Sequence, residues 1–188
     1  MTRRLIIIPI VHSSTDFGSL AEHVKTLYLE QFGATTWNER EQLVDKLWNV
    51  IQQGVADLKL DYRKVRIYQD GLPICGRELQ IVREVADAGS PNHQIVLALV
   101  DKGATLVGTE DPQLLIQEYQ MQRQQITAPE TKGGPTTKGT DLLEDRDRFI
   151  AARIEETLEE GDTGLVFLGA AHCLEKWLDS DIRVETLR

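Results

Sequence analysis

Two short apolar runs near opposite ends of the chain constrain its fold more than any other feature. Residues 5–11 read Leu-Ile-Ile-Ile-Pro-Ile-Val, and residues 165–171 read Leu-Val-Phe-Leu-Gly-Ala-Ala. Runs of this kind are typical of strands that are buried on both faces, as in a parallel sheet covered by helices. Each run is followed directly by a histidine, His12 or His172. Because ligands bind at the carboxyl edge of open α/β sheets, we expect both imidazoles at that edge.

The rest of the chain alternates between helical and strand patterns. Apolar residues at helical spacing predict helices over 19–32, 39–58, 76–88, 91–102, 112–126 and 141–160. Strands are expected over 4–11, 65–68, 104–107 and 164–169, with a possible edge strand over 182–187. Ser90 and Asp111, each followed by a proline, predict helix N-caps. The polar stretch 127–140 predicts a flexible loop, either a lid or a solvated connection.

These patterns predict an α/β fold, a single-domain sandwich over residues 1–188 with a mainly parallel central sheet flanked by helices. The formal net charge of −9 argues against general nucleic-acid binding, although a locally basic cleft could still hold a small anion. No apolar run approaches the roughly 20 residues that span a bilayer, so no membrane segment is expected. The N-terminal residues lack a small-residue cleavage site and are expected to form a first strand, not a signal peptide.

The sequence contains two cysteines, Cys75 and Cys173, without a disulfide-type spacing. Reduced thiols of this kind predict a cytoplasmic protein. Trp37, Trp48 and the acidic helices suit either internal packing or the face of a homodimer, and the sequence does not decide between them.

His12, His172 and Asp70 are the candidate metal ligands, because each follows a predicted strand. Two imidazoles and one carboxylate leave coordination positions open for water or substrate, and a metal-bound water becomes a nucleophile near neutral pH. Without a metal, the two histidines could act as acid and base. The alternatives are that each histidine caps a helix or bonds to loop backbone, and that Asp70 only begins an Asp-Gly turn.

Arg146, Asp147 and Glu110 complete the candidate catalytic set. Asp147 falls within an apolar helical stripe, and a carboxylate buried there needs a partner. Arg146 could therefore clamp an anionic group or transition state, with Asp147 orienting Arg146 or a histidine. The alternative is a solvated helix start with acids in its first turn. Glu110 follows a short strand and could supply a site acid, whereas Asp111 beside it is explained by capping.

The C-terminal third resembles a known group of proteins. A helix with the segment Asp145-Arg146-Asp147 precedes an apolar strand ending in Gly169-Ala170-Ala171-His172. This pairing looks like that of the TraB-like proteins and their relatives: the Tiki proteases, the ChaN haem-binding proteins and the erythromycin-esterase-like enzymes. The resemblance implies a compact α/β fold with two histidines, an acid and an arginine in one cleft. Tiki-type members are described as metal-dependent proteases, and many TraB-like members have no settled activity.

By position, His172 corresponds to the second Gly-x-x-His motif of this group and Arg146 to its helix arginine. His12 corresponds to the first motif only in its histidine, because Pro9 stands in place of the glycine. Asp70 stands where the group has a glutamate. The match covers two patches of the chain. The positions where this sequence differs from the group's pattern bear on the expected catalysis more than on the expected fold.

Two hypotheses follow from the sequence. The first is a small cytoplasmic hydrolase acting on a small molecule or peptide, in which His12, His172 and Asp70 hold one divalent metal ion or act as acid and base. The second is a non-catalytic protein of the same fold that binds or senses a small anion at the same edge. An interaction scaffold, in which these side chains have no role, is a third class.

Overall fold

The structure is a computed structural model that describes residues 3–11, 13, 21–127 and 137–187. Its centre is a five-stranded sheet with the order β3-β2-β4-β1-β5, and every neighbouring pair of strands runs parallel. The strands are β1 (Arg3–Ile10), β2 (Val65–Gln69), β3 (Thr105–Val107), β4 (Thr163–Gly169) and β5 (Ile182–Thr186). The predicted α/β fold with a parallel sheet is therefore confirmed.

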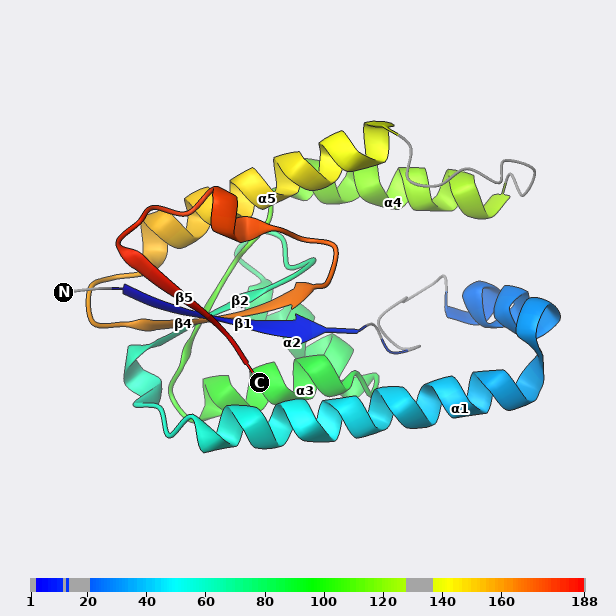
Figure 1. Cartoon of the computed structure of the whole chain (residues 1–188), viewed down its shortest axis with the longest axis horizontal. Coiled ribbons are helices and arrows are strands. Elements are labelled where there is room, and N and C mark those ends of the chain that lie inside the picture. The colour runs from blue at the N-terminus through cyan, green and yellow to red at the C-terminus, as the bar shows by residue number, and fades with distance from the viewer. Residues whose placement is uncertain (1–2, 12, 14–20, 128–136, 188) are drawn as a thin grey trace.

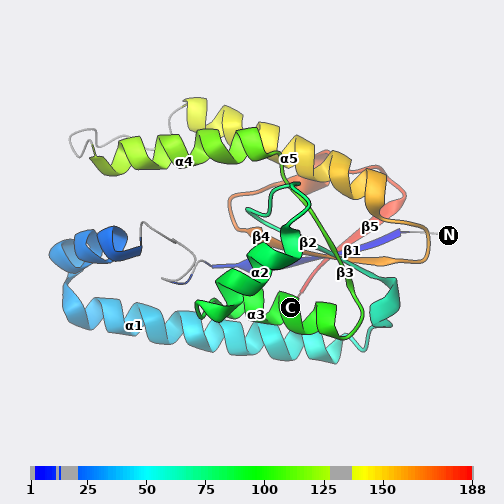
Figure 2. The same cartoon turned by 180° about the vertical axis from the view of Figure 1, so that it is seen from behind.

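Helices cover both faces of this sheet (Figures 1 and 2). The helices are α1 (Ala21–Asp57), α2 (Glu78–Asp87), α3 (Pro91–Asp101), α4 (Pro112–Thr127) and α5 (Thr137–Thr157). Two short 3-10 helices, η2 (Tyr62–Lys64) and η3 (Leu174–Lys176), precede β2 and β5. Helices α1, α2 and α3 lie on one face, and α4 and α5 lie on the other. In the described residues, no helix is both long enough and apolar enough to cross a membrane.

The two apolar runs identified from the sequence form the adjacent inner strands β1 and β4. Their side chains alternate between two apolar clusters, one on each face. Ile6 and Phe167 pack under α1, α2 and α3, whereas Leu5 and Val166 pack under α5. Because each of these side chains is at most 1% exposed, both faces of the central strands are dry, as parallel sheets require.

The helices expected over 19–32 and 39–58 correspond to the two arms of α1, which meet at a kink at Gly33, with φ 82° and ψ 165°. The second arm begins directly after this glycine, earlier than residue 39. The predicted loop 127–140 is shorter than expected, because α4 includes Thr127 and α5 already begins at Thr137; residues 128–136 lie outside the described part. The predicted N-caps are confirmed: the side chains of Ser90 and Asp111 accept the backbone N–H groups of His93 and Gln113.

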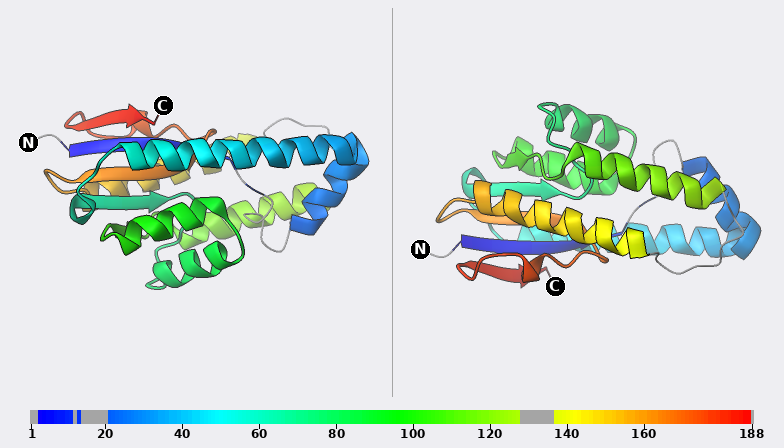
Figure 3. Two further views of the ribbon diagram at one scale, coloured as in Figure 1. Left: turned by 90° about the horizontal axis from the view of Figure 1, so that it is seen from below. Right: turned by 90° about the horizontal axis from the view of Figure 1, so that it is seen from above.

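The connections that leave β2 and β4 run in opposite directions across the sheet. From β2 the chain passes through α2 and α3 to the outer strand β3, and from β4 it passes through η3 to the opposite outer strand, β5. Figure 3 shows α3 along the β2–β3 half of the sheet and α1 along the β1–β5 half. Such a reversal leaves a crevice outside the carboxyl ends of the two strands, which is where α/β proteins place their sites.

Candidate functional site

Asp70 lies at this reversal, directly after β2. Its Oδ2 accepts the backbone N–H of Gly169, the last residue of β4, at 3.0 Å. The next residue, Gly71, has φ 77° and makes the turn that leads the chain away from the sheet. Asp70 thus begins an Asp-Gly turn, as one interpretation of the sequence held, and it also places a carboxylate between two neighbouring strand ends. The side chain is only 8% exposed.

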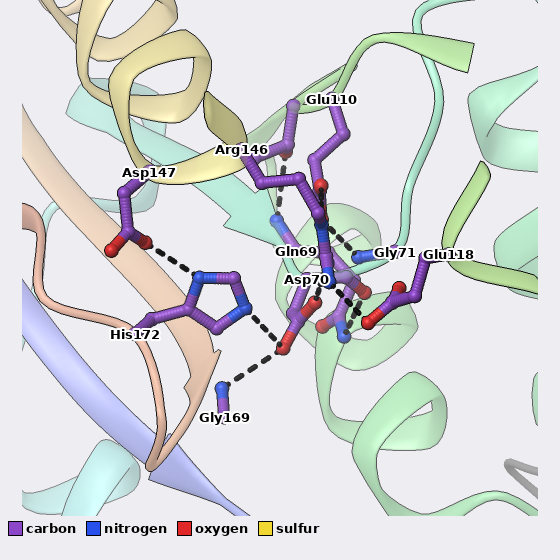
Figure 4. Close-up of polar contacts among 10 residues, drawn as sticks. Gln69, Asp70, Gly71, Glu110, Glu118, Arg146, Asp147, Gly169 and His172 are labelled. Atoms are coloured by element: carbon purple, nitrogen blue, oxygen red, sulfur yellow. Dashed lines mark hydrogen bonds and ion pairs between the residues drawn. The ribbon is translucent and has the colours of Figure 1, made fainter. Parts of the chain in front are cut away.

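Arg146 on α5 binds three carboxylates at the same edge (Figure 4). Its Nε donates to Glu110 Oε2 at 2.6 Å, and its Nη2 donates to Asp70 Oδ1 at 2.7 Å and to Glu110 Oε1 at 2.8 Å. Its Nη1 lies 2.7 Å from Oε1 of Glu118, on α4. We call these four residues, Arg146, Asp70, Glu110 and Glu118, the Arg146 cluster. The guanidinium is almost fully buried and uses all three of its nitrogens on carboxylates of the protein.

Glu110 is held in place by the backbone around it. Its Oε1 accepts the N–H of Gly71 at 2.6 Å. The preceding residue, Thr109, is completely buried and bonds through its hydroxyl to the N–H of Gln69 and to the C=O of Val107. These bonds fasten the end of β3 to the end of β2. The chain therefore delivers Glu110 to Arg146 from a rigid strand end.

His172 lies between two carboxylates, in the turn that follows β4. Its Nδ1 is 2.6 Å from Oδ1 of Asp147 on α5, and its Nε2 is 3.4 Å from Oδ2 of Asp70. The second oxygen of Asp147 accepts the backbone N–H of Cys173 at 2.9 Å. Asp147 therefore fixes both the ring and the turn that carries it. The Nε2 side is held less closely, which leaves this nitrogen for a further group.

The charges of these residues shift one another's pKa values. Burial by itself would lower the pKa of His172, but the contacts with Asp147 and Asp70 outweigh it and raise the pKa to about 9. Burial would raise the pKa of Asp70, yet His172 and Arg146 hold it well below its usual range. Glu110 shows the opposite balance: burial raises its pKa more than Arg146 lowers it. At neutral pH the imidazole is therefore protonated and Asp70 is ionised.

The site as a whole carries more acid than base. Four carboxylates, those of Asp70, Glu110, Glu118 and Asp147, face two cationic groups, Arg146 and protonated His172. Burial is the main cause of the raised pKa of Glu110, and the neighbouring charge of Asp70 adds to it. Such an arrangement attracts protons or cations and disfavours a free anion.

A cavity of about 380 Å³ adjoins His172. Apolar side chains form much of its wall, including Ile7, Pro9, Leu168 and Leu174. A ligand in this cavity would place its apolar part against the ends of β1 and β4 and a reacting group beside the imidazole.

The structure brings together five of the six residues singled out as catalytic or metal-binding in the sequence. Asp70, Glu110, Arg146, Asp147 and His172 form one continuous set of contacts. The sixth, His12, lies outside the described residues. One residue was missed, Glu118. It lies on α4 among the partly buried Leu114 and Met121 at helical spacing, which is the same signal that identified Asp147 on α5.

Two described residues at this edge, His172 and Asp70, could contribute ligand atoms to a divalent metal ion, but Arg146 already binds the other oxygen of Asp70. The 3.4 Å between His172 Nε2 and Asp70 Oδ2 is close to the roughly 3.3 Å between two ligand atoms of tetrahedral zinc. A carboxylate on the other ring nitrogen, as Asp147 provides, is the usual partner of a metal-binding histidine. The third predicted ligand is His12. Elsewhere in the described residues, Glu155, Asp179 and Asp181 approach metal-binding geometry, but Arg3 pairs with Glu155 and Asp181.

The fold and the site define a class: an α/β protein with a parallel sheet and a buried arginine–histidine–carboxylate site where the strand order reverses. No protein-family model matches the chain, and no curated protein or solved structure matches it significantly. The resemblance to the TraB-like group therefore stays a prediction from sequence motifs.

Proposed function

We propose that this protein is a hydrolase and that His172 is its proton donor. The observation that carries the proposal is the position of His172, which lies between Asp147 and Asp70 and borders a largely apolar cavity. A carboxylate on Nδ1 fixes the ring so that Nε2 is the reacting nitrogen. Because its pKa is raised to about 9, the imidazole carries a proton at neutral pH that it can give to a leaving group.

The other residues of the site position His172 and control its charge. Asp70 stays ionised and stabilises the imidazolium, and Arg146 holds Asp70 and Glu110 in place. The cavity beside the ring suits the apolar part of an ester or amide. The sequence pairs His172 with His12 as acid and base, so in this proposal His12 would be the complementary base.

A divalent metal ion is part of this proposal as a possible cofactor. His172 and Asp70 would hold it, together with His12, and the ion would supply a water activated near neutral pH. Metal binding requires His172 to lose its proton, so binding and proton donation compete at this nitrogen.

The alternative from the sequence, a non-catalytic small-anion binder, has less support. It relies on Arg146 as the anion clamp, and every nitrogen of that guanidinium already contacts a carboxylate. An incoming anion would have to displace Glu118, the most exposed of the three partners at 33%.

The test is hydrolysis of p-nitrophenyl esters from acetate to octanoate, with the matching anilides and p-nitrophenyl phosphate. Each is assayed after chelator treatment and again with added Zn²⁺ or Mn²⁺. We expect turnover of acyl substrates by the wild type, and a kcat/KM at least about 100-fold lower for His172→Gln. Without metal, kcat/KM should fall as the pH rises past about 9, where His172 loses its proton.

His23→Gln is the matched control, because His23 is exposed on α1 and touches none of the site residues described here. Its kinetics should equal those of the wild type. Circular dichroism verifies that both variants are folded. The proposal fails if the folded wild type turns over none of the substrates under any metal condition, or if His172→Gln keeps full activity.

A further inference from the structure

The outer strand β5 has an unpaired side within the described part of the chain. It pairs only with β1, and the backbone N–H of Leu187 donates to the C=O of Ile7 at 2.9 Å. Alternate residues of a parallel edge strand bond inward, so the backbone groups of Val184 and Thr186 point away from β1. Such an edge is a ready template for another strand.

The charges along β5 are complementary to a second copy of β5. In an antiparallel pair centred on Val184, each Arg183 faces Glu185 of the partner subunit. Both side chains lie on the α1 face of the sheet, because Glu185 is in register with Ile6. This register also makes Val184 and its symmetry mate a hydrogen-bonded pair, since their backbone groups are the ones that point outward.

We propose that two copies of this chain associate through β5, with a two-fold axis at Val184, to form one continuous sheet. The contact is isologous, as a closed two-fold dimer requires. It is independent of the proposed hydrolase activity, because β5 lies at the far end of the sheet from β2 and the Arg146 cluster.

A groove beside the edge of β5 supports a second copy of the chain as the partner. Its volume is about 620 Å³, and α1 and β5 form its walls, with Asp57 and Glu185 as its two carboxylates. Arg183 is 73% exposed and pairs with Glu185 of its own strand at 3.0 Å. Glu185 also pairs with Arg4 on β1, at 2.7 Å. In the dimer, Arg183 of the partner subunit would take the place of the chain's own Arg183 beside Glu185. Opposite charges across strands stabilise pairing.

The neighbouring face of α1 adds apolar area to this edge. Leu43, Leu47 and Val50 are exposed, at 65%, 37% and 64%. Together with Gly54 they follow helical spacing along one side of α1. A Cβ on Gly54 would lie 3.4 Å from Leu187, so this side of the helix faces the end of β5. A strand edge alone falls short of the roughly 1,200 Å² of a stable interface, and these side chains extend it.

The opposite outer strand is a poorer candidate. β3 has three residues, Thr105–Val107, and none of them is charged. A short edge of this kind offers few backbone hydrogen bonds, and it has no charged side chains that could fix the register of a pairing strand. The structure therefore favours β5 as the contact between two copies.

Sedimentation velocity of the full chain tests the proposal. The wild type should sediment as a dimer at high micromolar concentration. Val184→Pro removes an N–H that points away from β1, so it costs no bond inside the chain and should yield a folded monomer. Arg183→Glu places like charges opposite each other and should raise the dimer dissociation constant roughly tenfold or more.

The double variant Arg183→Glu/Glu185→Arg restores opposite charges across the two-fold axis and should recover part of the dimer, since the arginine introduced at position 185 lies beside Arg4. Arg148→Glu, on the distant α5, is the charge control and should remain dimeric. A monomeric wild type overturns the proposal, and so does a dimer that persists undiminished in Arg183→Glu. If circular dichroism shows that Val184→Pro is unfolded, the charge variants alone decide whether the dimer forms through β5.

Discussion

Arg146 sets the electrostatics of the sheet edge. Its side chain is 4% exposed and contacts Asp70, at 8%, and Glu110, at 1%. Taking such groups out of water is costly, and the cost is offset only while every partner stays in place. The same residue thus keeps three acids together and prevents them from repelling one another. Replacing this one residue would leave the three carboxylates without their shared counter-charge.

We expect Arg146→Met to destabilise the protein by about 3–5 kcal/mol, because it leaves buried carboxylates without a counter-charge. The measurement is urea denaturation followed by circular dichroism. Adding Glu110→Gln to Arg146→Met removes one of the unpaired charges and should recover part of the loss.

Arg148→Met is the matched control, two residues along α5. Arg148 is 54% exposed, pairs with Glu144 at 3.1 Å and lies 4.4 Å over the Trp177 ring. Exposed interactions of these two kinds each contribute at most about 1 kcal/mol. If Arg146→Met and Arg148→Met cost the same, the Arg146 cluster does not stabilise the fold as argued.

At the scale of elements, β4 connects the fold to the site. It is the central strand, between β2 and β1, and its last residue, Gly169, binds Asp70. Near its start, Gly164 lies where β1 and β2 approach closely. A Cβ at Gly164 would come within 2.7 Å of Leu5 Cδ1 and 3.3 Å of Tyr68 Cε2. The side chains of Leu5 and Tyr68 therefore pack over β4 in the space left by the missing side chain of Gly164.

Gly164→Ala should lower the free energy of unfolding by about 1–3 kcal/mol, the usual cost of overpacking a core. The closest contact is a terminal methyl of Leu5, so Leu5→Val should relieve it. A double-mutant cycle measured by urea denaturation tests this: Gly164→Ala should cost less in the Leu5→Val background. Equal costs in both backgrounds would show that the close contact is not the cause.

The elements themselves could be predicted from sequence because local patterns specify them. The apolar runs of β1 and β4 and the capping pairs at Ser90 and Asp111 are local signals. The exact start of α5 could not be predicted, since Thr137–Thr140 has no apolar periodicity. The break in α1 falls where the first predicted helix ends, directly before Gly33. The connection was expected to run to residue 39, but one glycine with positive φ redirects the helix without any intervening loop.

The sequence identified most residues of the site, but it did not show which of them contact one another. Asp147 stood out because a carboxylate within an apolar stripe needs a partner, and that partner is His172. The three acids around Arg146 come from the segments that follow β2 and β3 and from α4, and their meeting depends on the strand order β3-β2-β4. Strand order is set by long-range packing, which single-sequence periodicity does not encode.

At the scale of the whole molecule, the buried titratable groups make stability depend on pH in both directions. Asp70 has a lowered pKa, so its contribution is present above its ordinary value of 3.8 and is lost as the pH falls below it. His172 has a raised pKa, so its contribution is complete below 6.5 and is lost as the pH rises through about 9. Glu110, also raised, adds to the loss on the rising side. Stability should therefore be greatest between about pH 4 and 6.5.

His172→Gln should flatten the alkaline side of this profile. In the wild type, the free energy of unfolding should fall by up to about 3 kcal/mol between pH 6.5 and 9, since one pKa unit corresponds to about 1.4 kcal/mol. Glutamine has no proton to lose in this range, so the variant should be less stable than the wild type at pH 6 and nearly equal to it at pH 9. Urea denaturation across this range measures both curves, with His23→Gln as the variant that should retain the wild-type slope. An unchanged slope in His172→Gln would mean that Asp147 and Asp70 do not hold a proton on this imidazole, and the assignment of His172 as proton donor would lose its basis.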